Sequence, residues 1–213
     1  MKRLCCFLLS CTLLFPGCTA KPAETFPREY VLIDVGHGGF DGGAVAIDGS
    51  CEKDYNLSIS LILRDILKVC GISVVMTRET DTALAPKKSE DMRQRLALYE
   101  GAQSVISIHQ NQFSIPRYSG TQTFYSSQNV NSKTLAEAIQ SAVTQHIQPD
   151  NHRPVKAVEN GVFLFNNTTA SAALVECGFL SNETELQKLK TPEYQQQLSF
   201  AITLGYFTYL IQK

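Results

Sequence analysis

The sequence lacks a charge imbalance of either sign. Its 213 residues include 19 lysines and arginines against 20 aspartates and glutamates, giving a net charge of -1 at pH 7. Nucleic acids and anionic membrane surfaces are bound through clustered positive charge, so the composition offers no electrostatic basis for either partner. Internal repeats are also absent, which excludes a solenoid. With 44% hydrophobic and 18% charged residues, the chain fits one globular domain.

Cysteines are scarce outside the first twenty residues. Four of the seven lie in that segment, and the rest of the chain keeps only Cys51, Cys70 and Cys177. An odd number without C-x-x-C spacing excludes a disulfide framework and a structural zinc knuckle. We therefore expect free thiols that are mostly buried.

Residues 1–20 have the parts of an export signal. They begin with a basic segment, continue with an apolar run too short to span a bilayer, and end with small residues. We expect export, either with cleavage after Ala20 or with lipid attachment at Cys18, which would anchor the protein to a membrane. Residues 21–28 are expected to form a short proline-containing tether, so that the folded domain spans residues 29–213.

Short apolar runs alternate with longer stretches of helical spacing along this domain. The runs are β-branched and end at glycine or polar residues, which is typical of buried strands. We expect strands over residues 30–35, 72–77, 104–108, 118–126, 161–165 and 172–175. We expect helices from Glu52, over 91–101 and 133–146, after a capping box of Asn182 and Glu185, and from Pro192 behind the cap Thr191. The alternation predicts a single α/β domain: a mostly parallel, twisted sheet of about six strands with helices on both faces.

Metal-ligating side chains collect at the ends of the predicted strands. His37, His109 and Glu176 each follow a strand directly, and Glu52 opens the helix after a glycine-rich loop. Ligands bind at the carboxyl ends of strands in such sheets. Two imidazoles and a carboxylate match the His₂Glu ligand set of hydrolytic zinc sites. A second carboxylate, for which Glu176 is the candidate, would carry the proton, and burial beside apolar neighbours would raise its pKa.

Simpler interpretations compete with a metal site. A histidine at a strand end often makes only structural hydrogen bonds, and a glutamate at a helix start favours the helix dipole. His146 on a solvent-exposed helix and His152 in a proline-containing loop are weaker metal candidates. A cysteine hydrolase using Cys177 with His109 is another alternative, although strand alternation directs Cys177 away from the side of Glu176.

Four segments of the chain resemble the motifs of one enzyme family. They read Asp34-Val35-Gly36-His37-Gly38-Gly39, Glu52-Lys53-Asp54, Ser107-Ile108-His109-Gln110-Asn111 and Val175-Glu176-Cys177-Gly178-Phe179-Leu180-Ser181-Asn182. In order and separation they are similar to the zinc-dependent N-acetylmuramoyl-L-alanine amidases. The resemblance covers essentially everything from Tyr30 to the C-terminus.

This resemblance implies a site and a reaction. The zinc ligands it implies are His37, Glu52 and His109, the catalytic carboxylate is Glu176, and the supporting residues are Arg95 and Asn111. The implied reaction is hydrolysis of the amide between the lactyl group of N-acetylmuramic acid and the L-alanine of the peptidoglycan stem peptide. A catalytically inactive peptidoglycan-binding domain is the alternative. The presence of all three implied ligands and of the implied catalytic carboxylate disfavours this inactive alternative.

The compact domain, the leader and residues 116–122 look most like the spore-cortex amidases of that family. Those enzymes strip peptides from muramic acid so that it can form muramic δ-lactam, so spore-cortex maturation is the expected context. Gln110 stands where the family more often has a small residue, and we expect it to alter the rim of the cleft. The need for an activating protein partner stays open, as does the choice between lipidation at Cys18 and a cleaved soluble form.

Overall fold

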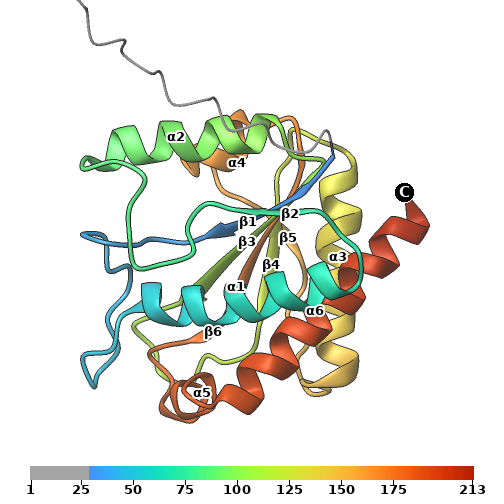
Figure 1. Cartoon of the computed structure of the whole chain (residues 1–213). Helices are drawn as coiled ribbons and strands as arrows, with labels where there is room; N and C mark the ends of the chain where they lie inside the picture. Colours follow the sequence, from blue (N-terminus) through green and yellow to red (C-terminus); the bar gives the residue numbers. More distant parts are fainter. Residues whose placement is uncertain (1–28) are drawn as a thin grey trace, which may run out of the picture.

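A computed structural model of the chain describes residues 29–213 (Figure 1). The predicted export signal, with the alternative lipid site Cys18, and the predicted tether lie outside the described residues. Within the described part, no helix combines the length and the apolar character needed to cross a bilayer.

Six strands form one sheet in the order β2-β1-β3-β6-β4-β5. Their bounds are β1 Val31–Val35, β2 Val74–Met76, β3 Ser104–Asn111, β4 Gln122–Tyr125, β5 Lys156–Ala157 and β6 Ser171–Phe179. β1 pairs in parallel with β2 and β3, and β3 with β6, whereas β4 runs antiparallel to β6. The mostly parallel sheet is therefore confirmed. The carboxyl ends of β1, β3 and β6 meet at one edge, where ligands bind in such folds.

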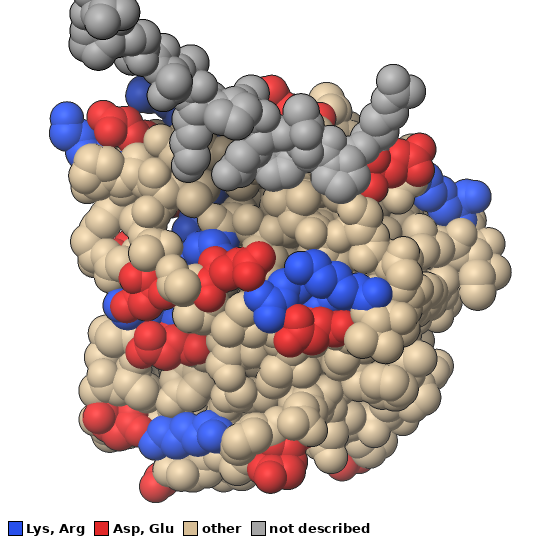
Figure 2. All heavy atoms as spheres, viewed as in Figure 1, with Lys and Arg blue, Asp and Glu red and all other residues tan. Residues whose placement is uncertain are grey.

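Helices cover both faces of this sheet, as predicted. They are α1 Glu52–Val69, α2 Lys88–Glu100, α3 Asn131–His146, α4 Phe163–Asn167, α5 Glu183–Leu189 and α6 Pro192–Gln212. α1, α3 and α6 pack on one face, and α2 and α4 on the other (Figure 1). Lysine and arginine side chains are interspersed with aspartate and glutamate on the face shown in Figure 2, in accord with the balanced composition.

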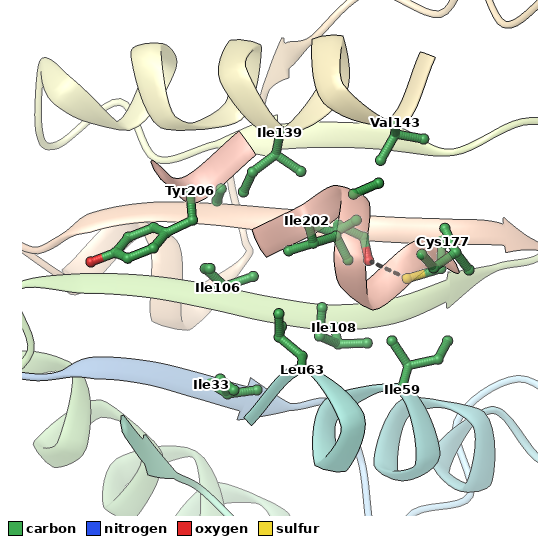
Figure 3. Packing of buried hydrophobic residues seen from close by; sticks show 14 of the residues in the cluster. Ile33, Ile59, Leu63, Ile106, Ile108, Ile139, Val143, Cys177, Ile202 and Tyr206 are labelled. Atoms are coloured by element: carbon green, nitrogen blue, oxygen red, sulfur yellow. Dashed lines mark hydrogen bonds between the residues drawn. The ribbon is translucent and has the colours of Figure 1, made fainter. Parts of the chain in front are cut away.

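The larger core lies between the sheet and helices α1, α3 and α6 (Figure 3). Strand residues meet helix residues there, and all are almost completely buried: Ile33, Ile106, Ile108 and Cys177 from the strands, with Ile59, Leu63, Ile139, Val143, Ile202 and Tyr206 from the helices. Full burial of one such aliphatic side chain contributes about 1.5–3 kcal/mol. A smaller core under α2 and α4 contains Leu32, Tyr99 and Phe165. The two cores fix the sheet edge that carries the polar residues.

The predicted strand over residues 161–165 is wrong, because this segment leads into helix α4. Periodicity cannot separate a strand from a helix in so short an apolar run. Leu164 and Phe165 bury themselves against the smaller core, and Asn167 Nδ2 donates to the Phe163 carbonyl at 2.7 Å. The two-residue strand β5 was not predicted, since its exposed residues carry no apolar pattern.

Two predicted strands end later than expected. β3 runs through His109 to Asn111, and β6 runs through Glu176 to Phe179, so neither His109 nor Glu176 terminates its strand. The pairing of β3 with β6 changes register between His109 and Asn111. A β-bulge therefore lets both strands continue past the polar residues. The predicted helix over 91–101 also begins earlier, at Lys88.

The capping box predicted for α5 forms only in part. Asn182 Oδ1 accepts from the backbone N–H of Glu185 at 3.1 Å. The Glu185 carboxylate does not return a bond to Asn182 but accepts from the backbone N–H groups of Gly120 and Phe179, both at 2.8 Å. Glu185 therefore joins α5 to the ends of β4 and β6. The predicted cap of α6 is present, because Thr191 Oγ1 accepts from the Tyr194 N–H at 3.3 Å.

The three cysteines of the described chain are free, as predicted. The expectation that they are mostly buried is wrong: Cys177 is buried, Cys51 is partly buried and Cys70 is exposed. Cys70 follows the last residue of α1 as its C-cap.

Candidate metal centre

His37 directly follows the Val35-Gly36 end of β1 in an unusual backbone conformation. Among the described residues it is the one non-glycine residue with a positive φ, 59°. Its carbonyl oxygen accepts hydrogen bonds from Arg78 Nε at 2.8 Å and from Arg95 Nη2 at 2.7 Å. The left-handed region costs an L-residue about 1–2 kcal/mol, and these two charge-assisted bonds offset that cost.

Glu52, the first residue of α1, lies between the two histidines. Its Oε2 is 3.2 Å from His37 Nε2, and its Oε1 is 2.8 Å from His109 Nδ1. The same carboxylate accepts from the backbone N–H groups of Ala44 at 2.9 Å and Gln110 at 3.1 Å. Burial opposes its charge, but hydrogen bonds from His109 and His37 hold the pKa of Glu52 well below its usual range. Asn56 Nδ2 also donates to Glu52 Oε1 at 3.2 Å, so Glu52 is an ionised carboxylate held by five partners.

His37, Glu52 and His109 have the chemistry and spacing of a metal site. One ligand atom from each lies within 4.8 Å of the other two. Ligands of a tetrahedral ion with bonds of about 2.1 Å lie roughly 3.4 Å apart, close to the His37–Glu52 and Glu52–His109 distances. Two glycines leave room for these side chains. A Cβ on Gly36 would lie 2.4 Å from the His109 ring, and one on Gly43 would lie 2.6 Å from Glu52 Oε2. These residues fit a divalent ion.

Asp41 stands behind His37 on the side away from Glu52. Its Oδ2 lies 3.0 Å from His37 Nδ1 and 3.0 Å from Lys88 Nζ. His37 Nδ1 is buried and makes no aligned hydrogen bond to any described residue. A carboxylate facing the second ring nitrogen is the common arrangement for a histidine ligand, because it fixes the orientation of the ring.

Glu176 pairs directly opposite His109 across β3 and β6. His37, His109 and Glu176 line one cavity of about 210 Å³, whose wall also includes Lys88 and Phe163. Burial raises the pKa of Glu176 to about 7. Its Oε2 is buried without a hydrogen-bond partner among the described residues. A carboxyl group with this pKa and an unused oxygen can exchange protons near neutral pH.

The remaining residues named from the sequence take different places. Arg95 is buried beneath the site, and Asn111 ends β3 with its carbonyl accepting from the Leu180 N–H at 2.8 Å. His146 and His152 are exposed and do not belong to the metal cluster. Cys177 points into the larger core, where burial raises the pKa of its thiol far above the usual value. A thiol of this kind is unsuited to nucleophilic catalysis.

Gln110 does not line the cleft, contrary to expectation. Because strand residues alternate between faces, its side chain lies on the α1 side, where Nε2 donates to Asn56 Oδ1 at 3.2 Å. Sequence reasoning also missed Asp41 and Arg78, which act on His37 from outside the ligand set. The signal for Asp41 was its position four residues after His37 in the glycine-rich loop.

Comparison with known proteins places this chain in a family. The model of the family Amidase_3, N-acetylmuramoyl-L-alanine amidase, matches residues 31–206. The germination-specific N-acetylmuramoyl-L-alanine amidase of Bacillus subtilis strain 168 is 37% identical over 195 residues, covering 87% of this chain and 81% of the relative.

Solved structures agree with that assignment. The CwlD amidase from Clostridioides difficile, solved in complex with the GerS lipoprotein, matches with a TM-score of 0.83 and 34% identity, over 88% of this chain and 100% of that one. The N-acetylmuramoyl-L-alanine amidase from Clostridium difficile 630 matches with a TM-score of 0.78 and 31% identity, over 88% and 100% of the two chains. This chain therefore belongs to the Amidase_3 family of N-acetylmuramoyl-L-alanine amidases.

Proposed function

We propose that this protein hydrolyses the amide between the lactyl group of N-acetylmuramic acid and the L-alanine of the stem peptide in peptidoglycan. The observation that carries the proposal is the placement of Glu176 directly beside the His37–Glu52–His109 cluster. A metal-binding cluster and a carboxyl group of pKa about 7 in one cavity are the two components that hydrolysis of an unactivated amide requires.

Zinc is the proposed ion, with His37, Glu52 and His109 as its ligands. Two neutral imidazoles and one carboxylate suit zinc, and three protein ligands leave a position for water and substrate. When bound, the ion would polarise the substrate carbonyl and make a water molecule more acidic. Binding of the ion requires these ligands in their deprotonated form and therefore releases any proton that the histidines share with Glu52.

Glu176 is proposed to move the proton. In its ionised form it accepts a proton from the attacking water, whose oxygen forms the new bond to the carbonyl carbon. As the C–N bond breaks, Glu176 gives that proton to the nitrogen of L-alanine and returns to the carboxylate. A pKa near 7 suits both directions of transfer at neutral pH.

The proposed setting is the maturing spore cortex. The germination-specific relative in Bacillus subtilis is 37% identical to this chain and supports this choice. Export through residues 1–20 would bring the enzyme to its substrate, with lipid attachment at Cys18 as one way to retain it at a membrane. Deletion of the gene should leave vegetative growth normal and give spores whose cortex lacks muramic δ-lactam. A defect in daughter-cell separation would instead assign the enzyme to the vegetative wall.

The decisive experiment measures zinc content and muropeptide products on one purified sample incubated with peptidoglycan. About one zinc per chain together with free stem peptides that begin at L-alanine is the expected result. Zinc without product would indicate that a protein partner is missing, in line with the lipoprotein bound to the Clostridioides difficile relative. Neither zinc nor product would favour a non-catalytic peptidoglycan-binding domain.

A further inference from the structure

Arg153 holds its guanidinium group in a fixed position at the edge of the sheet. Nε donates to the Ser119 carbonyl at 2.6 Å, and Nη1 donates to Gln122 Oε1 at 3.2 Å. The guanidinium carbon lies 4.6 Å from the centre of the Phe179 ring and 5.6 Å from that of Tyr118. Aromatic faces and two neutral oxygens thus orient a charged group that is only partly exposed.

This guanidinium is linked through Gln122 to the strand position opposite Glu176. Gln122, which accepts the bond from Arg153, pairs directly opposite Glu176 in the β4–β6 ladder. Residues directly opposite on neighbouring strands project from the same face of the sheet, so Gln122 lies on the face of the cavity. Gln122 Nε2 donates to the Pro154 carbonyl at 2.9 Å, which ties the Arg153 segment to β4.

The bulge in β6 brings Phe179 to the same face. His109 pairs with Glu176, and Asn111 pairs with Phe179, so one residue of β3 stands opposite two residues of β6. Asn111 shares a face with His109 because the two are two residues apart, and Phe179 therefore shares a face with Glu176 despite the odd spacing of three. The bulge places the Phe179 ring on the face of the sheet that carries Glu176, and Arg153 stacks on that ring.

Arg153 has no carboxylate partner within the described part of the chain. Among the described residues it takes part in no ion pair, and its Nη2 has no hydrogen-bond partner. Glu185 is the acidic residue whose charge acts on it, but both Glu185 oxygens accept from the backbone N–H groups of Gly120 and Phe179. A partly buried guanidinium with an unused donor is suited to an anion supplied from outside, and its planar fork suits a carboxylate.

We propose that Arg153 binds a carboxylate of the peptidoglycan stem peptide, a proposal that rests on the amidase function above. Glu176 gives its proton to the nitrogen of L-alanine, the first atom of the departing peptide, so the peptide begins beside Glu176. Beyond L-alanine the stem is acidic, since its second residue is a glutamate. Its carboxylate then meets Arg153, which sets the preference for the peptide half of the substrate.

Two synthetic substrates test this assignment on the zinc-loaded enzyme. One is N-acetylmuramoyl-L-alanyl-D-glutamate with the α- and γ-carboxyl groups of glutamate free, and the other is its neutral diamide. We expect kcat/KM to favour the acid by about tenfold or more, as for other charge-assisted hydrogen bonds. Arg153→Gln should bring the two substrates to within about twofold, and Arg153→Lys should restore part of the preference.

Lys133→Gln is the matched control, because it removes the same charge from an exposed position on α3. It should keep the wild-type preference. An unchanged preference in Arg153→Gln would overturn the proposal, as would loss of the preference in Lys88→Gln with Arg153 intact, since Lys88 is the cation on the other wall of the cavity.

A binding measurement separates this proposal from the amidase function itself. Calorimetry on Glu176→Gln protein with the free dipeptide L-alanyl-D-glutamate requires no turnover. Added Arg153→Gln should weaken that binding by about tenfold, and equal binding would refute the role of Arg153. If wild-type enzyme cleaves neither substrate, the amidase function fails, whereas the calorimetric comparison still decides whether Arg153 recognises the carboxylate.

Discussion

Arg95 Nη2 donates to the carbonyl oxygen of His37 at 2.7 Å, directly behind the imidazole that faces Glu52. The same guanidinium donates through Nη1 to Asp34 Oδ1 and through Nε to Asp91 Oδ2, both at 2.7 Å. It therefore connects a metal-site backbone in a strained conformation to two carboxylates that are buried inside the domain.

Replacement of Arg95 by lysine should weaken metal binding more than it weakens the fold. Lysine keeps the charge beside Asp34 but cannot reach both carboxylates and the His37 carbonyl at once. We expect roughly 10- to 100-fold weaker zinc affinity, measured by competition with a chelator. Arg93→Lys, on the exposed side of the same helix, is the control and should bind zinc like wild type. Unchanged affinity in Arg95→Lys would show that His37 needs no such support.

Asp34 should make the stability of the domain sensitive to acid. Burial opposes its charge, but Arg95, together with hydrogen bonds from Ser107 and Tyr99, lowers the pKa of Asp34 below its ordinary value. A depressed folded-state pKa contributes stability above the unfolded value of about 3.9, and that contribution is lost as pH falls through the folded-state pKa. Urea unfolding of metal-free protein should therefore show a steeper loss below about pH 4 in wild type than in Asp34→Asn. Equal slopes in the two proteins would contradict this.

Gly36→Ala should damage the metal site through contact alone. The added Cβ would lie 2.4 Å from the His109 ring, and Gly36 does not have a positive φ, so steric displacement of the ring is the cause. We expect loss of stoichiometric zinc and of activity. Gly42→Ala places its Cβ at an ordinary 3.5 Å from Cys51 Sγ and should keep both. Zinc content and circular dichroism of the two variants make the comparison, and full zinc occupancy in Gly36→Ala would be the contrary result.

Glu176→Gln should separate turnover from metal binding. Glutamine keeps the size of the side chain but cannot accept and return a proton, so kcat should fall by about 10²- to 10⁴-fold while zinc content stays the same. His37→Ala should lose both zinc and activity, because it removes a proposed ligand. If zinc disappeared from Glu176→Gln as well, Glu176 would have to be counted among the ligands.

The sequence predicted the fold well where a pattern was long or reinforced by neighbouring signals. α1 begins at Glu52 as expected, and the strand before His37 and the helix behind Thr191 are also present. Residues 161–165 failed because a short apolar run is compatible with a strand or a helix, and only the packing of Phe165 against the smaller core decides between them.

The sequence predicted that the candidate site residues lie close together, because three of them follow predicted strands and the fourth opens a helix. It did not reveal how the strands pair. The sequence grouped His37, Glu52, His109 and Glu176, and the structure brings them together. The sequence could not indicate that β3 continues past His109 and β6 past Glu176, since this depends on the register between strands that are far apart in the chain. Arg153 escaped notice for the same reason: its partners Gln122 and Phe179 are close only after β4 and β6 have paired.

The bulge between Glu176 and Phe179 also makes the direction of the Phe179 ring depend on how β6 pairs with β3. Regular pairing of the present residues would turn the Phe179 ring to the opposite face of the sheet, away from Arg153, because a separation of three residues along a regular strand reverses the face. Removal of one residue between Glu176 and Phe179 would instead allow regular pairing with the ring still on the face of Glu176, since a separation of two residues keeps the face. The extra residue of β6 and the bulge that absorbs it must therefore be kept or lost together for the aromatic ring to stay on the side of Glu176.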